Sequence, residues 1–284
     1  MAFDGPAEEG SALWAPTANL ARMTDGSTPR EFYAKTYDAS VADWPGELDF
    51  YLALARKATG ELLELAAGTG RIAIRLAEAG YHVTGLDHSA EMLDVARARS
   101  THLPNMRWIE ADVRTFDVGR QFGLIIIPGH SFQNLLTADD QIACLRRVAA
   151  HLAPGGRFVV HLDHQDVDWL GAISPGGTLA GVFEPAEAFV HPETGRTVRP
   201  SQAWTYLRSD QAALLSTRWE ELDDAGTAVA TVEDGPTPIH CVFPYEMEHL
   251  LGRAGFTIKA LYGDFKGSEL TDRSTEMLWM AQIR

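Results

Sequence analysis

Residues 61–72 constrain the fold of this chain more than any other stretch. They read Glu-Leu-Leu-Glu-Leu-Ala-Ala-Gly-Thr-Gly-Arg-Ile, which is a short apolar run, a Gly-x-Gly turn and the start of an apolar-periodic segment. That order predicts a buried strand, a tight turn and a helix N-terminus, the unit that holds nucleotide-like ligands in α/β proteins. Gly68 and Gly70 let the backbone approach a ligand closely and tolerate a positive φ.

Apolar runs and helical patterns alternate along most of the chain. The expected strands are 62–66, 81–87, 106–109, 122–127, 157–162, 256–262 and 277–283, and the expected helices are 31–40, 49–55, 70–79, 90–99, 137–152 and 245–254. The run 122–127 is continuously apolar, as a central parallel strand buried on both faces should be. The alternation predicts an α/β fold with a doubly wound, seven-stranded, mostly parallel sheet.

Residues 164–240 break this alternation. They contain extended segments separated by polar turns, and no convincing helix, at 181–183, 203–207, 213–219 and 229–232. The pattern predicts an antiparallel insertion of three or four strands between the fifth strand and the last helix. We therefore divide the chain into an N-terminal lid or helical segment (1–44), a ligand-binding α/β domain (45–163 with 241–284) and the insertion, which covers the substrate or forms a dimer contact.

Charge and composition limit the partners of the chain. The 39 acidic residues outnumber the 24 basic ones and give a net charge of −15, which argues against nucleic acid as a partner because phosphate backbones need a basic surface. The sequence has two cysteines, no basic-then-apolar leader and no long apolar run. We expect a cytoplasmic protein without a membrane partner.

Two kinds of ligand compete for the glycine turn. Residues 68–73, Gly-Thr-Gly-Arg-Ile-Ala, fit a dinucleotide motif, and Asp87 lies about 20 residues further on, where an acid would hold a ribose. However, Glu64 at the end of the strand would repel a pyrophosphate, whereas it suits the cationic amino-acid end of S-adenosylmethionine (SAM). Asp112, after the next apolar run, could meet an adenine amino group.

The order of these motifs resembles that of the class I SAM-dependent methyltransferases of the small-molecule type. The motifs are Glu64-x-x-x-Gly68-x-Gly70, Leu86-Asp87-x-Ser89 and Ala111-Asp112-Val113. The resemblance covers residues 58–163 and returns at 243–284, where a closing helix and two strands are similar to the last elements of that family. It implies SAM as the cofactor.

The resemblance also implies which residues hold SAM. Asp87 would accept from both ribose hydroxyls, and the residues implied at the cofactor are Glu64, Ala66, Gly68, Gly70, Asp87, His88, Met92, Asp112, Val113 and Ile127. Two of the acids have simpler alternatives. Asp87 could be an acid at a helix N-terminus, and Asp112 could cap its own loop.

His130 is the sharpest catalytic candidate. Its segment, Pro-Gly-His-Ser-Phe-Gln-Asn-Leu at 128–135, directly follows the fourth strand, and ligands of parallel sheets bind at such strand ends. The segment is similar to those of small-molecule N-methyltransferases acting on glycine and on amino sugars of antibiotics. In the amino-sugar enzymes the histidine is a candidate base, which implies that role for His130. The alternative is a structural histidine that bonds its loop backbone.

Aromatic side chains and a further histidine are candidates for the acceptor pocket. Tyr33 and Tyr37 share one face of the expected helix and resemble N-terminal tyrosines that lie over the substrate, so either could hydrogen-bond the acceptor or pack beside the sulfonium. Phe132, His164 and Trp169 are expected to bind the acceptor together with His130. The alternative for these aromatics is core packing or, for Trp169, a dimer face.

Residues 161–164, His-Leu-Asp-His, invite a metal interpretation. Three ligands would converge there only if the chain turned at Asp163, because His161 and Asp163 share one strand face and His164 lies on the other. The acid-rich pattern of cation-dependent catechol methyltransferases is not evident. We predict no metal site.

The sequence therefore predicts a SAM-dependent methyltransferase that acts on an N or O atom of a small molecule of the kind found in natural-product metabolism. Carbon methylation is equally compatible with a base at His130. The alternatives are an NAD(P)-dependent oxidoreductase, opposed by Glu64 and Asp112, and a non-catalytic SAM-binding protein. A homodimer is compatible with the insertion.

Overall fold

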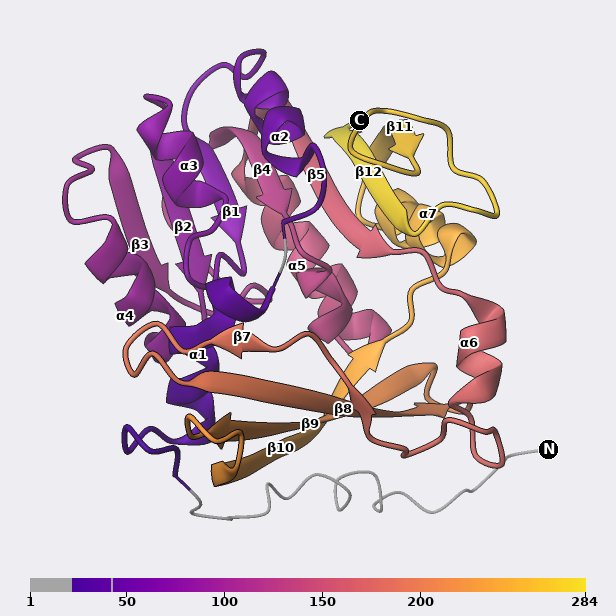
Figure 1. Cartoon of the computed structure of the whole chain (residues 1–284). Coiled ribbons are helices and arrows are strands. Elements are labelled where there is room, and N and C mark those ends of the chain that lie inside the picture. Colours follow the sequence, from indigo (N-terminus) through magenta and orange to yellow (C-terminus); the bar gives the residue numbers. More distant parts are fainter. Residues whose placement is uncertain (1–21, 42) are drawn as a thin grey trace, which may run out of the picture.

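The computed structural model describes residues 22–41 and 43–284, which form two sheets and the helices around them (Figure 1). The helices are α1 (Pro29–Ser40), α2 (Glu47–Ala55), α3 (Ala73–Glu78), α4 (Ala90–Arg99), α5 (Ala138–His151), α6 (Val167–Ala172) and α7 (Pro244–Arg253), with a 3-10 turn η1 (Ser131–Asn134). Residues 1–21 of the expected N-terminal lid lie outside the described residues. No helix within the described ranges is long and apolar enough to cross a bilayer.

The larger sheet has seven strands in the order β11-β12-β5-β4-β1-β2-β3. Its strands are β1 (Leu62–Leu65), β2 (Val83–Asp87), β3 (Met106–Glu110), β4 (Phe122–Ile127), β5 (Leu152–Asp163), β11 (Phe256–Tyr262) and β12 (Glu276–Ile283). The first five are parallel, whereas β12 runs antiparallel to β5, so that Glu276 pairs with Asp163. The first residue of β12 therefore lies at the edge where the parallel strands end.

Two apolar layers cover the faces of this sheet. Helices α5 and α7 pack on one face through residues such as Leu145 and Leu251, and α2 and α3 pack on the other through residues such as Tyr51 and Leu76. The expected helix starts are capped. The side chain of Ser89 accepts from the Met92 amide at the start of α4, and that of Thr137 begins α5 in the same way. The predicted doubly wound fold is confirmed.

The smaller sheet lies below the first in Figure 1 and contains the antiparallel insertion. Its strands are β6 (Glu184–Pro185), β7 (Phe189–Val190), β8 (Thr197–Leu207), β9 (Ala212–Leu222) and β10 (Ala228–His240), in the order β10-β9-β8-β6 with β7 also on β8. The antiparallel insertion is thus confirmed as part of the fold.

Two local expectations for the insertion are wrong. Helix α6 occupies residues 167–172, capped by Asp166, and six residues are too few to show a helical period in the sequence. The expected strand at 181–183 is absent because Gly181 turns the chain at a φ of 70°, and beside it only Ala180 forms an isolated bridge, to Trp204.

Helix α1 connects the two sheets. Phe32 packs edge-on against Trp219 of β9, with ring centroids 5.7 Å apart, within a small core of the insertion. On its other side, Asp38 accepts a hydrogen bond from the Thr69 hydroxyl in the glycine turn at 2.7 Å and also pairs with Arg99 of α4. The turn after β1 is therefore tied to the insertion through one helix.

Candidate active site

The turn after β1 has the geometry expected of a ligand cradle. Gly68 adopts a φ of 54°, and a Cβ atom at this position would meet nothing within 4 Å, so open space lies beside the turn. The Asp87 carboxylate orients the turn, since Oδ2 accepts from the Gly68 amide at 2.7 Å and Oδ1 from the Ser89 amide at 2.9 Å. Each oxygen retains a further lone pair for a ligand hydroxyl.

Glycine is required at position 70 for a different physical reason than at position 68. The φ of Gly70 is 80°, and a Cβ atom there would lie 2.5 Å from the tip of the Trp108 ring. Left-handed backbone and tight packing therefore both require glycine at this position. Ala66, at a φ of 53°, is left-handed as well, so the chain turns sharply at the end of β1.

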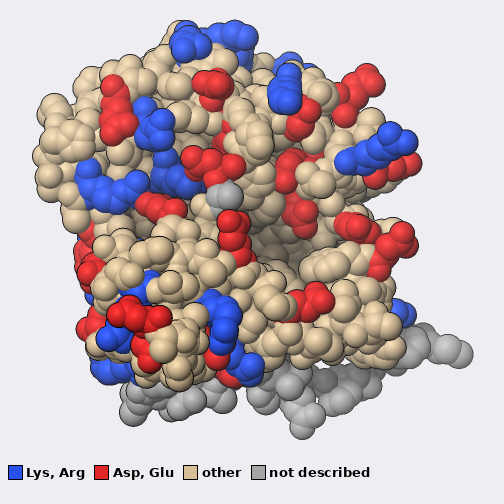
Figure 2. Space-filling view, in the orientation of Figure 1, with Lys and Arg blue, Asp and Glu red and all other residues tan. Residues whose placement is uncertain are grey.

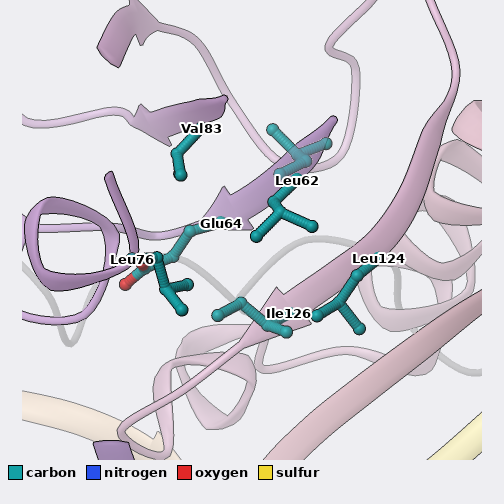
Figure 3. A pocket seen from close by; sticks show the side chains of 7 residues that line it. Leu62, Glu64, Leu76, Val83, Leu124 and Ile126 are labelled. Atoms are coloured by element: carbon teal, nitrogen blue, oxygen red, sulfur yellow. The ribbon is translucent and has the colours of Figure 1, made fainter. Parts of the chain in front are cut away.

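Glu64 carries the most informative polar group at this end of the sheet. Its side chain is 2% exposed, and its Oε2 atom has no hydrogen-bond partner among the described residues. Figure 3 shows the carboxylate beside Leu76, at the end of a small apolar pocket. Burial raises the pKa of Glu64 well above its usual range, with Arg71 opposing. A buried oxygen without a partner fits a ligand that brings hydrogen-bond donors, as the ammonium group of SAM does.

Arg71, the residue after Gly70, joins the turn to the segment before α2. Its guanidinium contacts the buried Glu47 carboxylate at 2.5 and 3.0 Å and Asp43 at 2.8 Å. A cavity of about 760 Å³ lies beside this ion pair, between the α1–α2 connection, α3 and the residues before β7. Trp44 and Phe189 are among the residues that line it. Neither Arg71 nor Glu47 was predicted from the sequence as a site residue, although Arg71 stands within the motif itself.

The residues implied at the adenine have fewer free hydrogen-bonding atoms for a ligand than Glu64 and Asp87. The Asp112 carboxylate accepts from the Arg114 amide at 2.8 Å and from its guanidinium, and this pairing lowers the pKa of Asp112. The plainer alternative, an acid that caps its own loop, therefore describes the arrangement of Asp112. The side chain of His88 is 84% exposed, whereas Ile127 is buried. Met92 and Val113 are half-buried.

His130 belongs to a second cluster at the same edge of the sheet. It follows β4, adopts a φ of 63° and has a side chain that is 27% exposed. Its Nε2 atom lies 2.7 Å from Oε2 of Glu276 and 3.1 Å from Nε2 of His161, and that nitrogen lies 2.6 Å from the same oxygen. In the part of the chain that the structure describes, these three side chains are the one group with metal-like spacing.

Neighbouring donors define the protonation of this cluster. The Gly129 amide donates to Nδ1 of His161 at 3.2 Å, so that nitrogen carries a lone pair and Nε2 carries the hydrogen. The Trp44 indole donates to Oε1 of Glu276 at 3.0 Å. Burial alone would raise the pKa of Glu276, but the hydrogen bonds from the two histidines outweigh it and lower the pKa to about 2. Burial lowers the pKa of His161 to about 4. The cluster therefore holds an anionic Glu276 and a neutral His161.

Glu276 and Trp44 were missed by the sequence analysis. Glu276 is 146 residues from His130 in the chain and reaches it only because β12 runs antiparallel, which places the first residue of that strand at the edge where β4 and β5 end. The available signal was an acid directly before the last apolar run, at a position where the fold makes a strand begin beside the site.

The other expected acceptor residues lie in varied settings. The ring of Tyr33 packs edge-on against that of Tyr37, with centroids 5.5 Å apart, and Tyr33 remains 40% exposed. The ring of Trp169 packs edge-on against that of Trp204 at 5.5 Å, on the inner side of the insertion. Phe132 is a correction, because it is 1% exposed and lies in the main core, where an acceptor cannot reach its ring.

The strand-end residues 161–164 do not gather around one point. His161 faces Glu276, whereas Nδ1 of His164 lies 2.8 Å from the Ser274 carbonyl oxygen. The Asp163 carboxylate accepts from Gln165 at 3.1 Å. Figure 2 shows that this face of the molecule is hollowed between the two sheets, with acidic side chains around the hollow.

Known proteins share both the sequence pattern and the fold. Residues 62–156 match the sequence model of the methyltransferase domain family. The chain is 27% identical over 262 residues to the putative methyltransferase YqeM of Bacillus subtilis (strain 168), covering 88% of this chain and 95% of that protein. It is 33% identical over 158 residues to the dTDP-3-amino-3,6-dideoxy-alpha-D-glucopyranose N,N-dimethyltransferase of Streptomyces fradiae, covering 54% of this chain and 59% of that enzyme.

A solved structure extends the likeness over most of the fold. The crystal structure of an S-adenosylmethionine-dependent methyltransferase from Clostridium acetobutylicum ATCC 824 superposes with a TM-score of 0.71 at 18% identity. The match covers 89% of this chain and 97% of that one.

Proposed function

We propose that this chain, a class I SAM-dependent methyltransferase that acts on a small molecule, methylates an amine nitrogen and uses His130 as the general base. The single observation that carries the proposal is the placement of His130. Its side chain stands at the carboxyl edge of the sheet with Nε2 held by Glu276, and Nδ1 makes no hydrogen bond to any described residue.

The residues at the end of β1 and β2 fit the cofactor. SAM, when bound, supplies an electrophilic methyl group on a positively charged sulfonium. Glu64 offers a buried oxygen without a partner, Gly68 leaves open space beside the turn, and Asp87 presents lone pairs for ribose hydroxyls. Asp112 and Val113 keep their proposed place at the adenine, which requires Asp112 to accept a donor in addition to Arg114.

His130 would remove the proton that amine methylation releases. A protonated amine has no lone pair, so a proton must leave before the nitrogen can form a bond to the methyl carbon. Nδ1 of His130 can accept that proton, and the anionic Glu276 stabilises the imidazolium that forms. We place Tyr33 and Tyr37 over the acceptor and His164 and Trp169 along its pocket.

An amine is favoured over a hydroxyl by charge and by relatives. The S. fradiae relative is named for dimethylation of an amino sugar. The chain carries a net charge of −15, and Asp163 and Glu276 stand at the strand ends near His130, an arrangement that attracts a cationic acceptor.

A matched pair of acceptors tests the proposal. The enzyme is incubated with SAM and either dTDP-3-amino-3,6-dideoxyglucose or the same nucleotide sugar with a hydroxyl in place of the amine, followed by a panel of simple amines that includes glycine. We expect methylation of amines only, and His130→Asn should lower kcat by about 100-fold or more. The exposed His249→Asn is the control. Turnover on hydroxyl or carbon acceptors alone, or a His130→Asn variant with unchanged kcat, contradicts the proposal.

We also propose that the protein acts in the cytoplasm as a homodimer and that the divisions at residues 44, 163 and 240 separate its parts. Exposed apolar side chains on the insertion, Val182, Val190 and Val229, support a contact between copies. Light scattering coupled to size exclusion tests the homodimer, and a monomeric mass at working concentration contradicts it.

A further inference from the structure

We propose that Glu276 is a positioning residue for the reaction, which holds the Nε2–H of His130 so that Nδ1 is the nitrogen that takes the acceptor's proton, while His161 holds Glu276 in place. This inference rests on the proposed role of His130 as the base. It assigns separate tasks to three side chains whose spacing in the structure would, by itself, also fit a metal site.

The tautomer of His130 follows from that of His161. Because the Gly129 amide faces Nδ1 of His161, the Nε2–H of His161 donates to Oε2 of Glu276 at 2.6 Å. If Nε2 of His130 carried a lone pair, that pair would face the same anionic oxygen at 2.7 Å and be repelled by it. Nε2 of His130 must therefore carry a hydrogen as well, and Nδ1 carries the lone pair.

The carboxylate itself is held from three sides. Trp44 donates to Oε1, the two histidines donate to Oε2, and the backbone of Glu276 is fixed by pairing with Asp163. The Trp44 ring packs edge-on against both imidazoles, with centroids 5.1 Å apart in each case. The side chains of His161 and Glu276 are 0% and 13% exposed, so both are more enclosed than the His130 side chain that they orient.

The same geometry argues against a cation at this point. A histidine that binds a metal through one nitrogen donates the other ring N–H to a carbonyl or carboxylate. Here the other nitrogen of His161 faces an amide donor instead, which leaves no lone pair on Nε2 for a cation. The three side chains therefore form a hydrogen-bonded frame.

Nuclear magnetic resonance can observe these tautomers directly. Long-range 1H–15N spectra are recorded on 15N-labelled protein saturated with S-adenosylhomocysteine (SAH), and His130→Asn and His161→Asn assign the signals. We expect both imidazoles to carry hydrogen on Nε2. Glu276→Gln should shift the His130 signals toward a mixture of tautomers, and the exposed Glu248→Gln should not. An Nδ1–H tautomer of His130 in the wild type overturns the inference whether or not the Glu276 variant folds. So does zinc that binds both imidazoles at neutral pH.

A double-mutant cycle tests the same inference through activity. With the best amine acceptor, Glu276→Gln should lower kcat by at least about tenfold in the wild-type background and have no further effect in His130→Asn, with the SAH Kd unchanged in both. An equal loss in both backgrounds overturns the inference. If His130→Asn keeps full kcat, the proposed base fails instead, and the tautomer spectra then judge Glu276 separately.

The pH profile adds a readout that a structural role would not change. The titratable groups facing His130 are His161 and Asp163 from β5 and Glu276 from β12, with Arg71 further off beside His161. Removing the charge of Glu276 destabilises the imidazolium, so Glu276→Gln should move the acidic limb of kcat/KM to lower pH. A limb that stays in place while the rate falls contradicts the inference.

Discussion

Two glutamates at the same edge of the sheet, the buried Glu64 and the partly buried Glu276, behave in opposite ways. Glu64, at the end of β1, has a carboxylate oxygen without a partner in the described structure, and burial raises its pKa. Glu276, at the start of β12, receives three N–H donors, and its pKa falls to about 2. In the proposed assignment, the cofactor side (Glu64, Gly68 and Asp87) keeps a carboxylate oxygen free for a ligand, whereas the donors around Glu276 on the base side (His130, His161 and Glu276) come from the protein itself. Satisfaction of hydrogen bonds thus separates a residue that awaits a ligand from one that positions a neighbour.

The largest expected effect concerns the rigid part of the cofactor side. Gly70→Ala should lower the free energy of unfolding by about 3 kcal/mol, because it adds left-handed strain and forces a Cβ atom against Trp108. Gly68→Ala, which meets no clash, should lose only about 1 kcal/mol yet weaken SAH binding. Urea unfolding and calorimetry separate the two effects. Equal destabilisation by both variants would break the distinction between packing and ligand access.

Glu276→Gln should destabilise the protein by about 2–3 kcal/mol. The variant leaves donors of Trp44, His130 and His161 around a neutral amide that can satisfy only part of them. Urea unfolding at neutral pH measures the change, and Glu248→Gln should stay within about 0.5 kcal/mol of the wild type. A Glu276→Gln variant as stable as this control would show that the frame is not satisfied as described.

Glu64→Gln should have the opposite sign. Replacing a buried carboxylate that has one oxygen without a partner removes a desolvation penalty, so the ligand-free protein should gain about 1–2 kcal/mol while SAH binds less tightly. The same unfolding and calorimetric measurements apply. Loss of stability together with unchanged SAH affinity would show that Glu64 does not bind the cofactor. The contrast with Glu276 would then no longer hold.

The pH dependence of stability distinguishes the two sides further. The pKa of His161 falls from 6.5 to about 4 on folding, so the folded state binds fewer protons than the unfolded state between these values. Its contribution is complete above pH 6.5 and is lost as the pH falls toward 4, on the order of 3 kcal/mol in total. His161→Asn should flatten the decline in unfolding free energy over this window. A wild-type decline confined to pH values below 4 would contradict the assignment.

The raised pKa of Glu64 acts in the other direction. A carboxyl group whose pKa is raised on folding stabilises the protein below its ordinary value, and this contribution is lost as the pH rises. Glu64→Gln should therefore gain more over the wild type at pH 8 than at pH 5, and SAH should reduce the difference. Unfolding curves at both pH values, with and without SAH, measure it.

The smallest expected effect concerns the tie between α1 and the glycine turn. Asp38→Asn removes the pair with Arg99, which is partly exposed on both sides, so stability should change by less than about 1 kcal/mol. Hydrogen exchange should nevertheless show weaker protection of α1 upon SAH binding, because Asp38 also holds Thr69. Unchanged protection would separate the N-terminal helix from the cofactor side.

The strand, the turn and the acid of the proposed cofactor side were predictable from the sequence because these parts are local. The strand, the turn and Asp87 lie within 26 residues of one another, between positions 62 and 87, and the Gly68 amide is held by Asp87 from only 19 positions away. The helix starts at Ser89 and Thr137 follow from side chains that cap the next turn. Such features depend on residues that are close together in the chain, so the sequence pattern alone can predict them.

The base side was only half predicted because its parts are distant. His130 could be named from its segment, but Glu276, Trp44 and the partner role of His161 depend on the antiparallel course of β12 and on the position of the α1–α2 connection. Phe132 was misplaced for a related reason, since η1 turns its ring into the core while His130, two residues earlier, stays partly exposed. Strand direction and side-chain orientation arise from tertiary packing, and no local pattern reports them.

The most direct test of the account is calorimetric titration of SAH into the wild type, His130→Asn and Asp87→Asn. We expect micromolar binding to the wild type, the same Kd for His130→Asn, and binding at least about tenfold weaker for Asp87→Asn, because a charged hydrogen-bond partner is lost at the turn. Equal weakening in both variants would contradict the separation of cofactor side and base side. No binding of SAH by the wild type would contradict the assignment of SAM as the cofactor.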